Sequence, residues 1–249
     1  NPYVVVFAGL ATVALLAYVC LPWLLVATHR GLASARSWHW PAVFGLVLAC
    51  AGGGVNAALL PWIVLPAAGL ALYEVAGRGC RLADVLSFGW RTLVCATVAS
   101  LWWIIPVLLQ ARYGADFLAF LEQPRTVWAT TSMSESLRLL GYWIVYVGSG
   151  FRGTPTPFVS VAPTYLFDYA VVVATLLIPV AAVLALRLRR GWSYGPYFGM
   201  LAAVTATVMA IGFPPGKPLN DLLTWIYENV SALQFLRTTY KAAPGLALA

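Results

Sequence analysis

Long runs without a single charged residue constrain this chain more than any other feature. Six such runs recur along its 249 residues, and most of them approach the roughly 20 residues that a helix needs to cross a lipid bilayer. A backbone inside a membrane must satisfy its own hydrogen bonds, so each run is expected to be a helix. The runs are continuously apolar rather than alternating, which excludes a transmembrane β-barrel.

The composition agrees with a membrane protein. Hydrophobic residues make up 61% of the chain, charged residues only 9%, and the mean hydropathy is +0.83. Ordinary globular domains carry about 25% charged residues. We therefore predict an all-α polytopic membrane protein, a bundle of about six transmembrane helices whose outer loops bear short interfacial helices.

The predicted spans cover residues 3–27, 40–54, 55–73, 92–109, 169–186 and 194–213. The first is too long for the apolar region of a signal peptide and has no basic region before it. The second ends in three consecutive glycines, Gly52 to Gly54, where we expect the chain to turn. The chain starts at Asn1 without a Met and stops as a new apolar run begins. We therefore expect residues 1–249 to form part of one transmembrane domain of a larger protein.

Arginines in short connections set the predicted orientation. Eight of them follow the first, third and fifth spans, and the positive-inside rule makes that side cytoplasmic. They are Arg30, Arg36, Arg78, Arg81, Arg91, Arg187, Arg189 and Arg190. The outer loop 110–168 and the outer segment 214–249 would then face outward from the plasma membrane. The net charge of +7 reflects this topology, because the basic residues form no continuous patch of the kind that binds nucleic acid.

Two further functional classes are disfavoured. No Asp, Glu, Lys, Arg or His lies in the central part of any predicted span, whereas proton- and ion-coupled transporters place such groups at mid-membrane. His29 and His39 flank one cytoplasmic loop without a Cys or an acid beside them, which favours interfacial residues over a metal site. We predict no metal site.

The outer loop contains a capping-box pattern, Ser132-Met133-Ser134-Glu135, so a helix should start there. Glu135 and Arg138 can pair across its first turn, and capping with pairing would explain both residues without a catalytic role. Apolar residues then recur at helical spacing, which predicts a helix in or near the outer interface. These residues are Leu137, Leu140, Ile144 and Val147.

The outer segment 214–249 offers a second polar group. Asn220 and Asp221 can start a helix at the outer surface. Arg237 and Lys241 would lie four residues apart on one face of a later helix, at headgroup depth. Two interpretations stay open: the cations anchor a following span at the interface, or they clamp the phosphate of a lipid-linked substrate.

Several short motifs together resemble one known family. They are Asn1-Pro2-Tyr3, Cys20-Leu21-Pro22-Trp23, His29-Arg30-Gly31, Trp40-Pro41, Gly53-Gly54-Val55-Asn56-Ala57-Ala58, Ser134-Glu135-Ser136-Leu137-Arg138-Leu139-Leu140-Gly141-Tyr142-Trp143 and Leu236-Arg237-Thr238-Thr239-Tyr240-Lys241. As a set they are similar to the N-terminal membrane region of the large alpha-(1->3)-arabinofuranosyltransferases of actinobacterial cell walls, the arabinofuranosyltransferase D type. The resemblance implies a GT-C fold, a bundle of many transmembrane helices with its active site at the outer face.

The same resemblance implies transfer of arabinofuranose from decaprenyl-phosphoryl-arabinose to the arabinan of arabinogalactan and lipoarabinomannan. It places Glu135 in the catalytic cavity, where its carboxylate would assist the attacking hydroxyl while Arg138 fixes it. Trp143, Arg237 and Lys241 are the further candidate substrate-binding residues. GT-C enzymes usually carry a catalytic acid in their first outer loop, and the resemblance implies that this loop lies upstream of Asn1.

Two functions stay open. One is a glycosyltransferase membrane domain, whose partners are the bilayer, a polyprenyl-phosphate sugar donor, an arabinan acceptor and the remainder of its own chain. The other is a non-catalytic protein that binds or translocates a polyprenyl lipid, with the same hydropathy and the same headgroup cations. An acidic residue in a first outer loop would favour the enzyme. The sequence indicates no particular cofactor.

Overall fold

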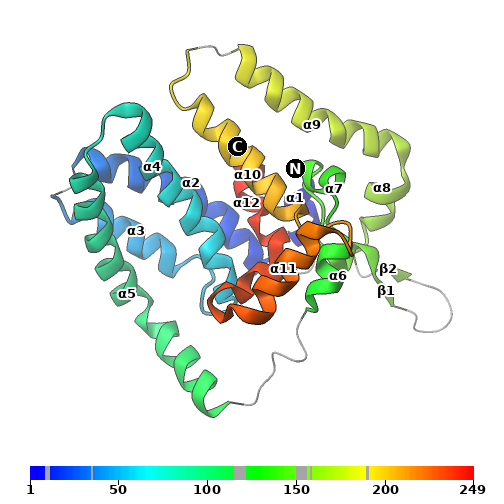
Figure 1. Cartoon of the computed structure of the whole chain (residues 1–249), viewed down its shortest axis with the longest axis horizontal. Coiled ribbons are helices and arrows are strands. Elements are labelled where there is room, and N and C mark those ends of the chain that lie inside the picture. Colours follow the sequence, from blue (N-terminus) through cyan, green and yellow to red (C-terminus); the bar gives the residue numbers. More distant parts are fainter. Residues whose placement is uncertain (9–11, 35, 115–121, 150–155, 158, 189–190) are drawn as a thin grey trace. The chain divides into compact units, whose positions relative to one another are not determined.

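A computed structural model describes residues 1–8, 12–34, 36–114, 122–149, 156–157, 159–188 and 191–249. The chain divides into two compact units. The bundle unit is Val13–Leu121, and the loop-rich unit combines Asn1–Thr12 with Glu122–Ala249. Each unit is built mainly from helices (Figure 1).

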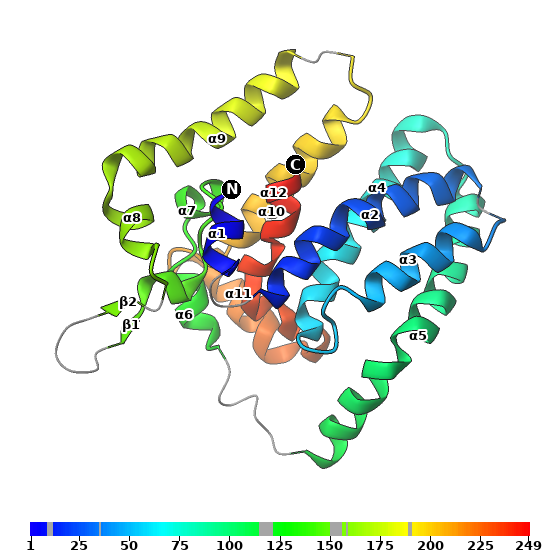
Figure 2. The same cartoon turned by 180° about the vertical axis from the view of Figure 1, so that it is seen from behind.

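Four α-helices form most of the described part of the bundle unit. Helix α2 (Val13–Ala33) packs against α3 (His39–Ala49) and α4 (Leu60–Arg78), and α3 also packs along α5 (Leu82–Tyr113). Figures 1 and 2 show them side by side from opposite directions. A glycine permits a close approach of α3 to α5, since a Cβ on Gly45 would lie 2.7 Å from the carbonyl carbon of Cys95 in α5. Contacts of this kind are typical of helix packing in membranes.

The chain turns after α3 at the predicted glycines. Gly52 has a φ of +84°, which residues with a Cβ rarely adopt. Its carbonyl oxygen accepts hydrogen bonds from the N–H of Val55 at 3.0 Å and of Asn56 at 2.9 Å. A short 3-10 helix, η1 (Ala57–Leu59), then leads into α4. The predicted turn is confirmed.

The loop-rich unit holds the remaining elements. In chain order they are α1 (Pro2–Ala8), α6 (Pro124–Ala129), α7 (Met133–Leu137), η3 (Trp143–Tyr146), β1 (Gly148–Ser149), β2 (Thr156–Pro157), α8 (Ala162–Phe167), α9 (Tyr169–Leu188), α10 (Gly195–Ala210), α11 (Pro218–Asn229), η5 (Ser231–Ala242) and α12 (Ala243–Leu248). Strands β1 and β2 pair antiparallel, with Gly148 opposite Pro157. This small hairpin was not predicted.

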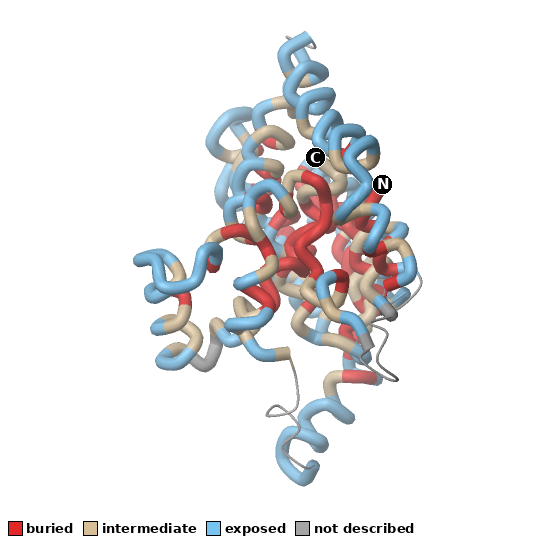
Figure 3. The backbone as a smooth tube through the Cα atoms, turned by 90° about the vertical axis from the view of Figure 1, so that its right-hand side faces the viewer, coloured by how far each residue is buried: buried red, intermediate tan, exposed pale blue. Residues whose placement is uncertain are grey.

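The last segment of the chain supplies much of the core of the loop-rich unit. Residues 238–245 are buried without interruption, and Figure 3 shows the tube in the buried colour as it approaches the C-terminal end. Helix α10 packs against both η5 and α12. The contact is close, because a Cβ on Gly245 would lie 2.7 Å from the Cγ2 atom of Thr205 in α10.

Among the described residues, four helical segments are long and apolar enough to cross a membrane, namely Val13–Ala33, Ala57–Arg78, Leu82–Tyr113 and Tyr169–Leu188. Two shorter apolar helices, His39–Ala49 and Gly195–Ala210, occupy the second and sixth predicted spans. Only 6% of the most apolar window of α9 is buried, so this helix offers apolar surface to lipid. The helical membrane fold is confirmed, whereas the number of six spans stays a prediction.

The helix boundaries differ from those of the predicted spans, most clearly at two places. The first predicted span, 3–27, is divided between α1 and α2, which belong to different units. Helix α5 begins at Leu82 rather than at Thr92, so Arg91 lies on the helix. The charged Arg91 ends the apolar run in the sequence, but it does not end the helix. Its guanidinium lies over the rings of Trp38 and Trp90, 5.6 and 5.2 Å from their centroids.

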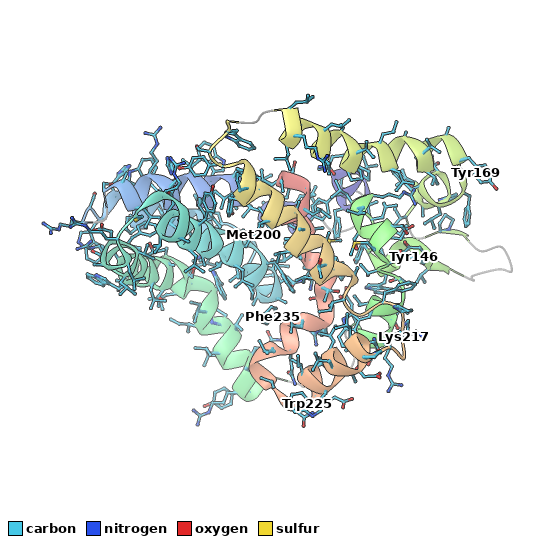
Figure 4. The ribbon with its side chains drawn as sticks, turned by 45° about the horizontal axis from the view of Figure 1, so that its top comes forward. Tyr146, Tyr169, Met200, Lys217, Trp225 and Phe235 are labelled. Atoms are coloured by element: carbon cyan, nitrogen blue, oxygen red, sulfur yellow. The ribbon has the colours of Figure 1, made fainter. Side chains whose placement is uncertain are left out.

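Helix α11 begins at Pro218 rather than at the predicted Asn220. Proline suits the first turn of a helix, where its missing N–H would have no intrahelical partner. Asn220 instead ties down the preceding turn, since its side chain accepts from the N–H of Gly216 at 3.3 Å and donates to the carbonyl of Gly212 at 2.8 Å. Trp225 is exposed on this helix (Figure 4), as an interfacial helix requires.

Candidate functional site

The carboxylate of Glu135 is held by two side chains of the loop-rich unit. The Nη1 group of Arg138 donates to Oε1 at 3.1 Å, and the hydroxyl of Tyr146 donates to Oε2 at 2.7 Å. The Glu135 side chain keeps 18% of its surface exposed, against 5% for Arg138. The predicted pairing of Glu135 with Arg138 is confirmed, and the contact with Tyr146 is new.

Residues far along the chain fix the guanidinium of Arg138. Its Nε donates to the hydroxyl of Thr175 in α9 at 2.9 Å, and its Nη2 donates to the carbonyl oxygen of Tyr165 in α8. The Nη1 group is already bonded to Glu135. Each of the three nitrogens therefore has an acceptor. A planar guanidinium held in this way has one orientation, which suits a residue that positions a carboxylate.

The start of α7 agrees with the sequence. Ser132 occupies the N-cap position, and its Oγ accepts from the N–H of Glu135 at 3.3 Å. The other half of the predicted capping box would have required the Glu135 carboxylate to turn back toward Ser132. That carboxylate instead binds Arg138 and Tyr146, so the cap and the ion pair use different parts of Glu135.

The predicted continuation of this helix through Val147 is wrong. Helix α7 ends at Leu137, and Leu139 and Gly141 adopt positive φ angles of +60° and +90°. Thr131 explains the reversal, because its hydroxyl donates to the carbonyl of Gly141 at 2.9 Å. A Cβ on Gly141 would approach the Thr131 Cγ2 atom to 2.7 Å. This tertiary contact overrides the helical spacing of the apolar residues.

The reversal leads into η3, which carries Trp143 and Tyr146. Burial is the main cause that raises the pKa of Tyr146, and the adjacent Glu135 raises it further, so the phenol keeps its proton at neutral pH. The indole Nε1 of Trp143 is buried, and the part of the chain that the structure describes supplies no acceptor for it. A buried donor without an acceptor costs about 1–3 kcal/mol, which makes this N–H a candidate ligand contact.

The prediction that Arg237 and Lys241 share one α-helical face is wrong. Segment η5 is a run of 3-10 turns, and Thr238 between the two cations has non-helical angles, φ −112° and ψ 57°. The neighbouring Thr239 hydroxyl donates to the carbonyl of Met209 at 3.3 Å, so the backbone follows α10 instead of a regular helix. Lys241 is only 7% exposed. Burial lowers the pKa of Lys241 most, Arg237 also lowers it, and Glu122 opposes both.

The sequence alone did not point to Glu122. This acid lies just before α6, and its two carboxylate oxygens accept from the hydroxyl of Tyr240 at 2.9 and 3.0 Å. The Nζ atom of Lys241 lies 5.7 Å from the centroid of the Tyr240 ring. Glu122 and Tyr240 are 118 positions apart, so no local pattern connects them.

Tyr240 belongs to an aromatic cluster that includes α1. Phe7 stacks on Tyr142 with ring centroids 4.7 Å apart, and Tyr142 contacts Tyr240 at 4.8 Å. Tyr3 lies 4.6 Å from Phe7. Burial, together with Glu122, raises the pKa of Tyr142 to about 12. Tyr142 thus contacts Tyr240, the hydrogen-bond partner of Glu122, while Tyr146, four residues later, is bonded to Glu135.

A separate polar cluster lies in the bundle unit. Glu74 pairs with the Nδ1 atom of His29 at 3.1 Å and with the Nε atom of Arg78 at 3.3 Å. A cavity of about 330 Å³ lies beside them, lined also by Cys80 and Asp84. His29 therefore has a carboxylate partner, which the sequence did not predict. Among the described residues no group of three His, Cys, Asp or Glu side chains is arranged to hold a metal ion.

Comparison with known proteins identifies the family. The family described as "Alpha-(1->3)-arabinofuranosyltransferase, N-terminal GT-C domain" matches residues 1–249. The chain belongs to this family. The resemblance drawn from the sequence motifs is confirmed at the level of the family.

One curated relative is an Alpha-(1->3)-arabinofuranosyltransferase of Mycolicibacterium smegmatis (strain ATCC 700084 / mc(2)155). It is 23% identical over 216 residues, which are 87% of this chain and 14% of the relative. The chain therefore spans a small part of that protein. No solved structure matches the chain. In this GT-C domain, Glu135 with its partners Arg138 and Tyr146 belongs to the loop-rich unit. Glu122 with its partner Tyr240 belongs to the same unit.

Proposed function

We propose that this GT-C domain takes part in the transfer of arabinofuranose from decaprenyl-phosphoryl-arabinose to arabinan, in arabinogalactan and lipoarabinomannan. The family match supports glycosyl transfer, and the name of the relative supports an arabinofuranosyl group and an α-(1→3) linkage. The donor, the acceptor and the outer face of the plasma membrane are our inference. The arginines predicted to be cytoplasmic support that orientation.

The Glu135–Arg138 pair carries the proposal at the level of residues. The Glu135 carboxylate is partly exposed, and Arg138 and Tyr146 hold one of its oxygens each. Every carboxylate oxygen has a second lone pair, so each can still accept a proton from a substrate. A carboxylate held in one orientation, with lone pairs left to accept a proton, has the geometry that a general base needs.

In the proposed step, the oxygen of an acceptor hydroxyl attacks the anomeric carbon of arabinofuranose. The new carbon–oxygen bond forms as the bond from that carbon to the phosphate oxygen breaks, and the polyprenyl phosphate leaves with the electron pair. The hydroxyl proton passes to the Glu135 carboxylate. Positioned general bases contribute about 10²- to 10⁴-fold to such steps.

Negative charge grows on the departing phosphate, so cations near it lower the barrier. Arg237 and Lys241 are our candidates for this role, and Lys241 is buried, where a charge interaction is less screened than in water. The unsatisfied indole N–H of Trp143 is our candidate donor to a sugar oxygen.

One observation favours the rival function, a non-catalytic protein that binds or translocates a polyprenyl lipid. Both oxygens of Glu135 already have donors, and the three nitrogens of Arg138 already have acceptors. Such a satisfied network also suits residues that only stabilise the loop. The two functions differ in whether a new glycosidic bond forms.

A transfer assay separates them. The natural protein that contains this domain would be reconstituted in vesicles with decaprenyl-phosphoryl-arabinose labelled in the sugar and a synthetic arabinofuranose oligosaccharide. We expect mass spectrometry to find the oligosaccharide lengthened by one pentose, with loss of the donor. Donor that binds or crosses the vesicle membrane without any lengthened product would contradict the enzyme and support the rival.

A further inference from the structure

We propose that Thr175, in the apolar helix α9, is a positioning residue that orients the carboxylate of Glu135 through the guanidinium of Arg138. Helix α9 thereby contributes to activation of the acceptor hydroxyl, although the Thr175 hydroxyl acts only through Arg138. The inference rests on the proposed function, because the orientation of Glu135 affects transfer only if Glu135 accepts the proton of the acceptor.

Burial distinguishes Thr175 from the rest of α9. All 20 residues of this helix are described, and Thr175 is the only one that is buried, with 6% of its surface exposed. The apolar Val173 and Leu177, two positions before and after it, are 59% and 58% exposed. A helix that turns its polar residue inward and its apolar residues outward is oriented by a polar contact, as is common between helices in membranes.

The hydroxyl of Thr175 connects the backbone of α9 to Arg138. It donates within the helix, to the carbonyl of Val171 at 2.8 Å or that of Val172 at 3.0 Å. A hydroxyl has one proton and two lone pairs, so its oxygen can still accept. The Nε group of Arg138 donates to this oxygen at 2.9 Å. Because the bond within the helix fixes the Thr175 side chain, the place of α9 determines where Arg138 finds its acceptor.

The corner between α8 and α9 holds the same guanidinium at a second point. The Nη2 group of Arg138 donates to the carbonyl oxygen of Tyr165 in α8. Asp168 lies between the two helices, and its Oδ1 atom accepts from the N–H of Ala170 at 2.9 Å, which caps the start of α9. Tyr165 and Thr175 stand on either side of this cap. Arg138 is therefore held by two acceptors from one ordered corner of the chain.

Arg138 carries this constraint to Glu135. Its side chain is buried, and its Nη1 group donates to Oε1 of Glu135 at 3.1 Å. A guanidinium is planar and rigid, so the bonds of Nε and Nη2 to the α8–α9 corner also set the direction of Nη1. Loss of the Thr175 hydroxyl removes the acceptor of a buried, charged donor, which must then turn toward another partner. Glu135 loses its orientation as a result, although Tyr146 still holds the other oxygen.

The position of the bond along α9 adds to its effect. The helix starts at Tyr169, which is 88% exposed (Figure 4). Thr175 comes six residues later, about 9 Å along the helix at 1.5 Å per residue. The contact with Arg138 therefore lies inside a predicted span and away from its exposed end. Water does not readily replace a lost acceptor in such a place.

Thr175→Val tests the role, because it keeps the shape of the side chain and removes the acceptor. We expect kcat for transfer to the arabinofuranose oligosaccharide by the natural protein to fall by roughly ten- to a hundred-fold, the effect of a small misplacement of a reacting group. The KM values for donor and oligosaccharide should not change. Thr175→Ser, which keeps the hydroxyl, should restore most of the wild-type kcat. A wild-type kcat in the folded Thr175→Val protein overturns the proposal.

Thr224→Val in α11 is the matched control. The hydroxyl of Thr224 donates to the carbonyl of Asn220 at 2.8 Å, the same bond across one helical turn that Thr175 makes with Val171. Among the described residues no arginine donates to Thr224, so we expect Thr224→Val to keep the wild-type kcat. An equal loss of kcat in both variants overturns the proposal, because the bond within the helix would then explain it. Thr175→Ala, which also lacks the hydroxyl and favours a helix, serves if Thr175→Val does not fold.

A double-mutant cycle tests the bond without any assay of transfer. Melting temperatures in detergent are compared for Thr175→Val, Arg138→Lys and the double variant, since each single change removes the bond between Nε and the hydroxyl. We expect the double variant to lose less than the sum of the two single losses, as partners in contact do. Additive losses overturn the bond and the proposal with it.

The two assays together separate this inference from the proposed function. If the wild-type protein transfers arabinofuranose and Thr175→Val transfers it equally well, the role of Thr175 is wrong and the function stands. If the wild-type protein transfers none, the proposed function is wrong and Thr175 has no proton acceptor to position. A non-additive cycle in that case shows only the hydrogen bond.

Discussion

The hydroxyl of Tyr240 donates to both carboxylate oxygens of Glu122, at 2.9 and 3.0 Å, across 118 positions of the chain. Tyr146 makes a corresponding contact with Glu135 at 2.7 Å. Burial is the main cause that raises the pKa of both phenols, so each keeps its proton at neutral pH. The hydroxyl group of each therefore donates a hydrogen bond to its carboxylate partner. Two acids are thus each oriented by a tyrosine hydroxyl, and each pairing stabilises one local arrangement of the loop-rich unit.

Replacing Glu135 tests the catalytic hypothesis. Glu135→Gln keeps the shape of the side chain and leaves the backbone N–H that Ser132 caps, but it removes the proton acceptor. We expect kcat of the natural protein to fall by about 10²- to 10⁴-fold, the usual contribution of a general base. The measurement is steady-state transfer to the arabinofuranose oligosaccharide, with thermal unfolding measured in parallel.

Ser132→Ala is the matched control for that variant. It removes the Oγ that accepts from the Glu135 N–H and should cost about 1 kcal/mol of stability, with the carboxylate left intact. If transfer depends only on a stable loop, both variants will lose activity in proportion to their stability. Full activity in a folded Glu135→Gln protein would assign Glu135 a purely structural role.

The donor-phosphate hypothesis predicts a different kinetic effect. Arg237→Gln and Lys241→Gln each remove a charge-assisted contact worth about 1.5–3 kcal/mol. At 1.4 kcal/mol per decade, each should weaken use of the donor by roughly ten- to a hundred-fold. We expect a higher KM for decaprenyl-phosphoryl-arabinose or a lower kcat, with the KM for the oligosaccharide unchanged. Normal donor kinetics in both folded variants would leave the cations as interfacial anchors.

Much of the local structure followed from the sequence. Apolar runs located the long helices, the glycine triplet located the turn at Gly52, and the capping pattern located the start of α7 at Ser132. These signals are local, since they depend on residues a few positions apart. The length of α7 was not predictable in this way, because Thr131 and Gly141 end it through a contact ten positions apart.

The candidate site was predictable only in part. The Glu135–Arg138 pair follows from their spacing of three, but the Thr175 contact of Arg138 and the Tyr240 contact of Glu122 connect distant segments. Helical periodicity also predicted the wrong position for Lys241 relative to Arg237. The segment η5 packs against α10, and the backbone at Thr238 between the two residues is not helical. Long-range contacts of this type need the fold before they can be inferred. Parts of the predicted outer loop 110–168, namely residues 115–121, 150–155 and 158, lie outside the described residues.

The predicted orientation can be tested by cysteine labelling. Thr156 belongs to β2 in the predicted outer loop, and Ser34 follows α2 among arginines predicted to be cytoplasmic. In intact cells, a membrane-impermeant maleimide should label Thr156→Cys and spare Ser34→Cys until the membrane is opened by detergent. The reverse pattern would contradict the outward position of the outer loop.

Close packing of α3 on α5 gives the last prediction. A Cβ on Gly45 would lie 2.7 Å from the carbonyl carbon of Cys95 and 2.8 Å from the nitrogen of Ala96, both of them backbone atoms that cannot rotate away. Gly45→Ala should therefore force the helices apart, at a cost of about 1–3 kcal/mol for overpacking. The gain in helix propensity, about 0.5–1 kcal/mol, offsets only part of this cost.

Gly69 in α4 is the matched control, because a Cβ there would meet no atom within 4 Å. Gly69→Ala keeps the gain in helix propensity without a clash, so its melting temperature in detergent should equal or exceed that of the wild type. Gly45→Ala should melt at a lower temperature than both. Both variants replace a helical glycine by alanine, and they differ only in the atoms that the added methyl group meets. Equal melting temperatures for the two variants would therefore contradict the close approach of α3 to α5.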